Sequence, residues 1–504
     1  MASADFTSAN HGLPHLAIFP FLSKGHTIPL IQLVNYLRHH QLATVTFFTT
    51  PGNAPFVRSG LLSGAGGDDD GAAVAVVELE FPTDVPGIQP GIESAEGLTS
   101  MAAFVAFAHA VSLLRPQFEA SVAAMRPPPR FIVADAFLYW TNDSAARLGV
   151  PKVSFLVTST FAHVMRELIV RHDPFSLLRP RATDVVIDDD ITPPATHSQT
   201  FSVPEFPRVS LPFEELMVAF KDASAFGPMM ELDGKMGKAI AQSHSLIINT
   251  FHGLEAPYIE FWDEHVHPRA WPIGPLCLAQ PAFEPGPTRP PRMGWLGGVG
   301  GAAAPPAQPV LYVALGTLSA IPALQVKQVA DGLDRSRLHF LWAARHDGDG
   351  DGDVDLGREF EERTKHRGLV VREWVDQPRI LRHRSVRGFL SHCGWNSVLE
   401  SVAAGVPLAA WPMNFDQPFN ARLLVDELRI AAMVWTSDSI ARGFVTDEEI
   451  SRVVGELMLG DVGVEAARNV ARLSASAKKA MDQGGSSWTA VREMISEFCK
   501  NECA

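Results

Sequence analysis

Short apolar runs alternate with amphipathic stretches along the first half of the chain. Residues 29–39 carry apolar side chains at the three- and four-residue spacing of a helix, and a second helical stretch runs to Ala146. Continuous apolar runs are typical of buried strands, and they occur at residues 15–21, 44–48, 131–135 and 152–156. Strands that alternate with helices predict βαβ units and therefore a parallel sheet.

The same alternation returns after Gln308. Strand-like runs occur at residues 310–315, 338–342, 370–371, 388–390 and 408–411, with helical stretches between them, and residues 448–499 are helical by pattern. Residues 278–309 separate the two halves and are rich in Pro, Gly and Ala, which do not sustain a helix or a central strand. The pattern predicts two α/β domains joined by a linker.

Length and charge agree with a two-domain globular protein. A chain of 504 residues is too long for one compact core, and 46% apolar and 19% charged residues are globular values. The net charge is −14 and no basic stripe is present, so we expect no nucleic-acid partner. An anionic ligand must therefore be held by local dipoles rather than by a basic field.

Cysteine usage and the N-terminus bear on the compartment. Cys277, Cys393, Cys499 and Cys503 are scattered and form no zinc-type cluster, which favours a reduced cytoplasmic protein. The N-terminus lacks the basic head and apolar core of a signal peptide. No uninterrupted apolar stretch of about 18 residues occurs, so we expect no membrane span.

Residues 374–417 contain the most specific pattern in the chain. A strand end at residues 388–390 is followed by the polar loop Ser-His-Cys-Gly-Trp-Asn-Ser and then by a helical pattern. This geometry points backbone N–H groups and a positive helix end at an anion. His392, Asn396 and Ser397 can cap this helix or donate hydrogen bonds to a phosphate.

Other side chains suit the remaining parts of a nucleotide sugar. The indole face of a flanking tryptophan can stack on a base, and Glu400 can accept hydrogen bonds from two ribose hydroxyls. Asp416 and Gln417 suit the hydroxyls of a sugar. Gly316 and Thr317 close the strand at 310–315, where glycine lets the backbone approach a diphosphate that the threonine hydroxyl can reach.

Residues 374–417 resemble the signature sequence of the plant secondary-metabolite UDP-sugar glycosyltransferases. The family's residues stand at Trp374, Gln377, His383, Gly388, His392, Cys393, Gly394, Trp395, Asn396, Ser397, Glu400, Gly405, Pro407, Trp411, Pro412, Asp416 and Gln417. Val375 and Asp376 stand where many members have Ala-Pro, and Arg387 replaces a common glycine. The resemblance extends to residues 271–276, and residues 23–30 and 310–317 are most similar to those of the subgroup numbered ninety.

This resemblance implies a GT-B type fold, in which two facing, doubly wound Rossmann-like domains enclose a cleft. The acceptor-binding domain would comprise residues 1–277 and the UDP-sugar-binding domain residues 310–485, with 278–309 as the linker. A terminal helix at residues 486–504 would cross back to the N-terminal domain. The resemblance implies a UDP-sugar site formed by Thr317, Trp374, Val375, Gln377, His392, Trp395, Asn396, Ser397, Glu400, Asp416 and Gln417.

His26 is the candidate general base. It follows the first strand, in a tight loop before a helix that should start near residues 27–29, with Pro29 in its first turn. Open α/β sheets bind ligands at such strand ends, and a histidine there can remove the proton of a hydroxyl acceptor. The alternative is a packing or capping histidine, but the position is similar to that of the family's base.

Asp135 is the candidate partner of His26. It ends its own strand, where a carboxylate can fix the tautomer of an imidazole and stabilise the imidazolium. The alternative is an N-cap for the following helix. Asp143 is the second candidate for the partner, but it lies inside the helical stretch.

The predicted enzyme is an inverting UDP-glucosyltransferase, a hexosyltransferase that transfers glucose from UDP-glucose to a hydroxyl of a small acceptor as a β-glucoside. We expect a monomer, and the scheme needs no cofactor and no metal. One alternative is a non-catalytic UDP-sugar or small-molecule-binding protein on the same fold. Another is a glycoside phosphorylase, but the chain offers no motif for its cofactor lysine or phosphate clamp.

The acceptor pocket should be formed by loops of the first half, which vary most within such families. Flat, lipophilic, hydroxylated acceptors such as flavonoids, other phenolics or a hormone are expected. Candidate lining residues are Met101, Phe104, Phe107, Phe137, Tyr139 and Phe161. For each of them, core packing is the alternative.

Overall fold

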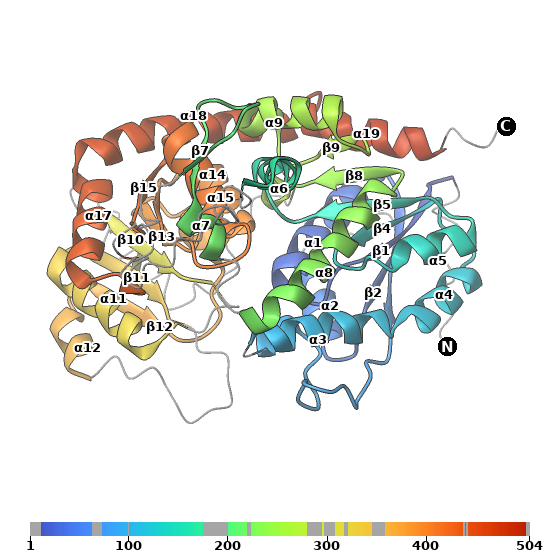
Figure 1. The fold of residues 1–504 in the computed structure, drawn as a ribbon, viewed down its shortest axis with the longest axis horizontal. Coiled ribbons are helices and arrows are strands. Elements are labelled where there is room, and N and C mark those ends of the chain that lie inside the picture. Colours follow the sequence, from blue (N-terminus) through green and yellow to red (C-terminus); the bar gives the residue numbers. More distant parts are fainter. Residues whose placement is uncertain are drawn as a thin grey trace, which may run out of the picture.

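The computed structural model describes residues 12–62, 73–98, 100–174, 200–218, 223–279, 295–296, 308–316, 321–344, 358–436, 439 and 442–499. Seven parallel strands form the sheet of the N-terminal half, in the order β3-β2-β1-β4-β5-β8-β9 (Figure 1). Their bounds are β1 His15–Phe19, β2 Thr44–Thr49, β3 Val74–Glu78, β4 Phe131–Asp135, β5 Lys152–Leu156, β8 Ser245–Ile248 and β9 Ala270–Pro272.

The central strands of this sheet are buried on both faces. Every residue of β1, β2, β4 and β5 is buried, which fits their largely apolar sequences, although β2 and β5 also bury Thr46, Lys152 and Ser154. The helices of the N-terminal half of the sequence are α1 Lys24–His39, α2 Ala54–Leu62, α3 Met101–Ser112, α4 Arg115–Ala124, α5 Thr141–Leu148, α6 Thr160–His172, α7 Phe213–Val218, α8 Ala223–Ala241 and α9 His252–His265, of which α7 lies against the C-terminal domain in Figure 1. Short 3-10 turns lie at Ala95–Gly97 and Leu276–Leu278, and β6 Thr200–Ser202 pairs with β7 Ser210–Pro212.

Six parallel strands form the second sheet, in the order β12-β11-β10-β13-β14-β15. Their bounds are β10 Val310–Ala314, β11 His339–Ala343, β12 Gly368–Val371, β13 Val386–Ser391, β14 Leu408–Ala410 and β15 Ala431–Met433. The helices of this half are α11 Ala323–Ser336, α12 Arg358–Thr364, α13 Gln377–Leu381, α14 Trp395–Ala404, α15 Gln417–Arg422, α17 Asp447–Leu459, α18 Asp461–Met481 and α19 Ser486–Cys499, with a π-helix at Leu423–Glu427.

Both sheets reverse their strand order beside the first strand. In the N-terminal sheet the reversal lies between β1 and β4, and in the C-terminal sheet it lies between β10 and β13. Ligands of doubly wound sheets bind outside the carboxyl ends of the strands at such a reversal. The predicted fold of two Rossmann-like domains is confirmed, and the two reversals mark where a site should lie.

The last helices connect the two halves. Along the top of Figure 1, α18 runs beside the C-terminal domain and α19 lies over the N-terminal domain. Val491, Met494 and Phe498 of α19 belong to the same apolar cluster as β1 and β2, and the rings of Phe498 and Phe131 are 4.7 Å apart. Ser487 also donates a hydrogen bond to the Gly274 carbonyl. The C-terminal segment therefore completes the core of the N-terminal domain.

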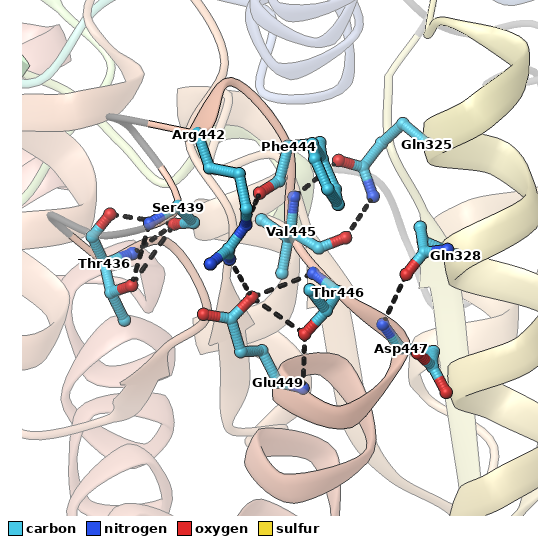
Figure 2. A network of polar contacts seen from close by, with 10 residues as sticks. All are labelled: Gln325, Gln328, Thr436, Ser439, Arg442, Phe444, Val445, Thr446, Asp447 and Glu449. Carbon is cyan, nitrogen blue, oxygen red and sulfur yellow. Dashed lines mark hydrogen bonds and ion pairs between the residues drawn. The ribbon is translucent and has the colours of Figure 1, made fainter.

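Figure 2 shows the polar contacts that join α11 to the start of α17. Thr446 is the N-cap of α17, and its hydroxyl accepts from the Glu449 N–H while the Glu449 carboxylate accepts from the Thr446 N–H. This reciprocal capping box fixes the first turn of the helix. Gln325 of α11 donates to the Val445 carbonyl at 2.9 Å and accepts from the Val445 N–H at 2.8 Å. The two helices are thereby held together on one side of the second sheet.

The sequence pattern missed some observed strands, and only part of the predicted linker can be compared with the structure. The strands β3, β8, β9 and β15 are absent from the prediction, and two of them are only three residues long. Most of the predicted linker lies outside the described residues. Within it, Leu296 is buried and its carbonyl accepts from the Ser385 hydroxyl. The domain limits themselves stay a prediction.

One described helical segment, Met101–Ala124, is long and apolar enough to cross a membrane by length and composition alone. It comprises α3 and α4, and Phe104, Phe107 and Phe118 on it belong to an apolar core cluster of the N-terminal domain. A core helix passes the same test, so this segment is weak evidence for a membrane span.

Candidate active site

His26 and Asp135 meet where the first sheet reverses its strand order. His26 lies in the first turn of α1, after β1, and Asp135 is the last residue of β4. Nδ1 of His26 is 2.7 Å from Oδ2 of Asp135, and the two side chains are 13% and 1% exposed. Because a carboxylate only accepts, Nδ1 donates and Nε2 keeps the lone pair that can accept a proton. The Phe137 N–H holds the other carboxylate oxygen at 2.9 Å.

The helix that carries His26 starts earlier than predicted. It begins at Lys24, so Pro29 lies inside the helix and not in its first turn. The cap comes from Glu96, whose Oε1 accepts from the Lys24 N–H at 2.6 Å and from the Ser23 hydroxyl at 2.9 Å. The sequence gives no signal for this carboxylate, because it is brought to the helix start by the tertiary fold.

Asp143 is not the partner of His26. Its side chain is 73% exposed and lies 3.4 Å from Arg115 on the surface. This agrees with the expectation that its place inside a helix makes it a surface residue.

Aromatic rings surround the exposed part of His26. The ring centroids of Phe21 and Phe137 are 5.4 and 5.2 Å from that of His26. Phe104 lies 5.8 Å from Phe137 and 5.7 Å from Phe415 of the second domain. Phe104 and Phe137 were predicted to line the acceptor pocket; Phe137 lies beside the histidine, and Phe104 is buried against Phe137.

Phe161 was also predicted to line this pocket, but it lies elsewhere. Its side chain is 1% exposed and its ring packs edge-on against Tyr258, 4.8 Å away. Phe161 is therefore a core residue.

The loop between β13 and α14 lies at the reversal of the second sheet. Gly394 is the N-cap of α14 and offers no side-chain cap, so the N–H groups of the first helical turn are not satisfied in that way. Cys393, which precedes it, has a φ of 64°, in the left-handed region. An uncapped helix start at the end of a parallel strand is an anion site of the predicted kind.

His392 is held between two glycines. A Cβ at Gly316 would lie 2.9 Å from the His392 Nε2, and one at Gly394 would lie 2.5 Å from it. The His392 Nδ1 is buried and has no hydrogen-bond partner among the described residues. Burial lowers the pKa of His392 to about 4, so the imidazole is neutral at neutral pH. A bound phosphate would raise this pKa and could accept from the ring.

Asn396 and Ser397 lie at the predicted helix start but contact protein groups. The Asn396 side chain donates to the Gly25 carbonyl at 2.6 Å, across the two domains. Gly25 precedes Pro29 by four residues, and proline has no N–H for the helical bond to that carbonyl. The Ser397 hydroxyl accepts from Gln377 at 3.0 Å. The Ser397 hydroxyl only accepts in this contact and the Asn396 amide has a second proton, so both side chains can still donate to a phosphate.

A chain of polar groups leads to Glu400. Tyr312 donates to the Gln377 amide oxygen at 3.1 Å, and the Gln377 amide nitrogen donates to Glu400 at 2.8 Å. Burial raises the pKa of Glu400 to about 7, against the lowering effect of the Gln377 bond. Trp374, three residues before Gln377, is 54% exposed, so its indole face is accessible to a nucleotide base. Val375 is partly buried against the core.

Two predicted ligand residues need comment. The Trp395 side chain is 3% exposed, and its indole N–H donates to the Asn249 carbonyl at 2.8 Å. Its ring is part of the contact between the domains, so only its backbone at the start of α14 can face a phosphate. Thr317 lies outside the described residues.

Asp416 and Gln417 lie at the start of α15. Burial raises the pKa of Asp416 to about 6, while its hydrogen bond from Asn420 and the charge of His26 lower it. The ring of the neighbouring Phe415 is 5.7 Å from that of Phe104, so the predicted sugar-binding acid lies at the boundary with the domain that carries the predicted base. The Gln417 amide oxygen accepts from the N–H groups of Met413 and Asn414, both at 2.9 Å. Its amide nitrogen remains to donate.

Comparison with known proteins decides the family. UDP-glycosyltransferase 90A1 of Arabidopsis thaliana is 38% identical over 495 residues, which cover 97% of each chain. This chain belongs to the plant UDP-glycosyltransferase family. The profile of the family described as UDP-glucoronosyl and UDP-glucosyl transferase matches residues 302–474. Both the family and the subgroup predicted from the sequence are confirmed.

Solved structures of plant UDP-glycosyltransferases are similar to this chain over nearly its whole length. UGT73P12 of Glycyrrhiza uralensis, complexed with glycyrrhetinic acid 3-O-monoglucuronide, is 27% identical and superposes with a TM-score of 0.80 over 97% of this chain and 96% of that one. UGT2 of Phytolacca americana, complexed with UDP-2fluoro-glucose and pterostilbene, is 26% identical, with a TM-score of 0.73 over 96% of this chain and 100% of that one.

Metal ligation was predicted to play no part in this UDP-glycosyltransferase. Within the described ranges, no group of three or more His, Cys, Asp or Glu side chains could hold a metal ion. The absence of a cofactor and of a metal from the reaction stays a prediction.

The raised pKa of Glu400 predicts a pH-dependent affinity of this UDP-glycosyltransferase for UDP-glucose. Ribose hydroxyls are predicted to donate to this carboxylate, in which case binding favours its ionised form and the affinity rises as the pH rises through about 7. Titration calorimetry between about pH 6.5 and about pH 8 measures this rise. Glu400→Gln should weaken binding by about 1–3 kcal/mol and remove the dependence.

Glu448 offers the matched control for this measurement. Its side chain is 71% exposed on α17 of the same domain, so Glu448→Gln should leave both the affinity and its pH dependence unchanged. A pH dependence that persists in Glu400→Gln would assign the titration to another group and remove the ribose role.

Proposed function

We propose that this UDP-glycosyltransferase is an inverting glucosyltransferase, which transfers glucose from UDP-glucose to a hydroxyl of a small lipophilic acceptor and forms a β-glucoside. The observation that carries this proposal is the pair of His26 and Asp135 at 2.7 Å, which the hydrogen bond from Asn396 to the Gly25 carbonyl brings against the second domain. A base on one domain and a sugar-binding acid on the other can present an acceptor hydroxyl to an anomeric carbon between them.

The proposed reaction is a single in-line displacement. Nε2 of His26 takes the proton of the acceptor hydroxyl, and the acceptor oxygen forms a bond to the anomeric carbon. The bond from that carbon to the diphosphate oxygen breaks, and its electron pair leaves with UDP. Asp135 stabilises the imidazolium that forms. One displacement inverts the anomeric centre, so an α-linked donor gives a β-linked product.

The leaving group would be stabilised by the loop between β13 and α14. The uncapped N-terminus of α14 supplies N–H groups and the positive end of a helix dipole, and His392 can donate to the diphosphate. The net charge of −14 makes such local donors necessary, since no general attraction of the protein for UDP exists.

The surroundings of His26 support a flat, lipophilic acceptor. The partly exposed ring of Phe137 lies beside the base, and Phe104 packs against both Phe137 and the partly exposed Phe415 of the second domain. Ring faces and edges of this kind favour stacking with an aromatic substrate. Flavonoids and other phenolics are therefore the acceptor classes to test first.

Removal of the base should abolish most turnover. His26→Ala should lower kcat by about a hundredfold or more, because a positioned general base supplies that scale of acceleration. UDP affinity should stay nearly unchanged, since the base lies on the opposite domain from the nucleotide site. A weakly acidic alcohol is the proper acceptor for this measurement, because an acidic phenol can ionise without help.

Asp135→Asn tests the second member of the pair, and Asp143→Asn is its matched control. The control removes an equivalent carboxylate that is 73% exposed, so its turnover should equal that of the parent. Unchanged turnover in His26→Ala, or equal losses in the two aspartate variants, would remove the catalytic pair. Binding of UDP-glucose by the parent without any turnover would favour a non-catalytic binding protein.

The donor preference should be UDP-glucose over UDP-galactose and UDP-glucuronate. Glucose and galactose differ in one hydroxyl at C4, and Asp416 and Gln417 can pair with one orientation only, so kcat/KM should differ by about tenfold or more. The resemblance of Gln417 to the last residue of the family signature implies a glucose donor. The carboxylate of glucuronate would also be repelled by Asp416. The test is to measure kcat/KM for the three donors with one acceptor. A preference for UDP-galactose or UDP-glucuronate would overturn the donor assignment.

A further inference from the structure

Asn420 joins three parts of the site. It lies on α15, outside the family signature, and its side chain is completely buried. Its amide nitrogen donates to the Asp416 carboxylate at 2.8 Å and to the Cys393 carbonyl at 2.9 Å. Its amide oxygen accepts from the Ser159 hydroxyl of the N-terminal domain at 2.7 Å.

The orientation of this amide is unambiguous. A carbonyl and a carboxylate both accept hydrogen bonds, so the nitrogen must face Cys393 and Asp416, and the oxygen must face Ser159. Both protons of the nitrogen are used. Any buried amide needs partners for these groups, and those of Asn420 come from three segments of the site.

Each partner has a role of its own in the site. Asp416 is the acid predicted to bind the donor sugar. Cys393 has a φ of 64°, which a residue with a side chain adopts at some cost, and it connects His392 to the N-cap of α14. Ser159 is the N-cap of α6, where its hydroxyl also accepts from the Ala162 N–H at 3.0 Å.

We propose that Asn420 is a positioning residue that holds the Asp416 carboxylate toward the donor sugar and ties it to the phosphate loop and to the acceptor domain. The inference rests on the proposed function, in which Asp416 accepts from the sugar hydroxyls. The simpler alternative is an ordinary contact between side chains four residues apart on a helix, with no bearing on the donor.

The electrostatics of Asp416 agree with this role. Burial raises its pKa to about 6, and the hydrogen bond from Asn420 opposes that rise. The titratable groups that interact with Asp416 are His26, whose charge lowers the pKa, and the buried thiol of Cys393. Loss of the Asn420 amide would raise the pKa of Asp416 and leave less of the ionised form to accept from the sugar.

The test compares the binding of UDP-glucose with that of UDP alone, by calorimetry on the full chain. Asn420→Ala should weaken UDP-glucose binding by about tenfold or more, the scale for a lost hydrogen bond to a charged group. UDP binding should stay within about twofold of the parent, because UDP lacks the sugar that Asp416 contacts. Asn420→Asp keeps the size of the side chain but cannot donate when ionised, and it should show the same selective loss.

The matched control is Asn469→Ala. Asn469 is 8% exposed, donates to the Arg429 carbonyl at 2.9 Å and accepts from Arg472, so this variant loses a comparable amide away from the site. Its binding of both ligands should match that of the parent. Circular dichroism on each variant establishes that the fold is retained.

Two further readouts separate positioning from general stabilisation. As the pH is lowered, Asp416 becomes protonated and the ratio of UDP-glucose affinity to UDP affinity should fall. In Asn420→Ala this fall should begin at a higher pH than in the parent. Ser159→Ala should also lower this ratio in the parent, but not in Asn420→Ala, where the contact between the domains is already lost.

The outcomes distinguish this inference from the proposed function. Equal losses of UDP and UDP-glucose affinity in the Asn420 variants, or no loss at all, would overturn the positioning role. An additive effect of Ser159→Ala in the Asn420→Ala background would overturn the link to the acceptor domain. A parent that does not bind UDP-glucose, in contrast, would contradict the proposed function itself.

Discussion

The whole site depends on the apposition of two parallel sheets at their carboxyl edges. Parallel strands place all their carboxyl-terminal loops on one edge, so two such edges that meet bring together residues far apart in the sequence. Hydrogen bonds from Asn396 to Gly25, from Trp395 to Asn249 and from Ser159 to Asn420 cross this boundary. Without this contact between the domains, His26 and Asp416 could not act on the same substrates.

Burial shifts the pKa values of three groups of the predicted site. Burial raises the pKa of Glu400 and Asp416 and lowers the pKa of His392, because each charged form loses its hydration. A diphosphate can supply the partner that His392 lacks, and hydroxyl donors can add to the bonds that Glu400 and Asp416 already accept from Gln377 and Asn420. The site is therefore built for a specific ligand and gains little from the net charge of the protein.

The features that the sequence predicts are local ones. Buried strands, the helix after residue 391 and the strand-end positions of His26 and Asp135 follow from periodicity and from the family signature. The sequence pattern does not predict the roles of Glu96 and Asn420 or the burial of Trp395. These features depend on contacts with residues 72, 261 and 146 positions away, respectively. The early start of α1 was missed for the same reason, since its cap is a distant carboxylate.

The configuration of the product tests the central claim most directly. If a base on one domain activates the acceptor against a sugar held by the other, the reaction is one displacement and inverts the anomeric centre. Nuclear magnetic resonance of the glucoside formed from α-linked UDP-glucose should then show only the β-anomer in the coupling of its anomeric proton. An α-linked product would require a second displacement or a different face of attack, and would contradict the arrangement of His26, Asp135 and Asp416 proposed for the reaction.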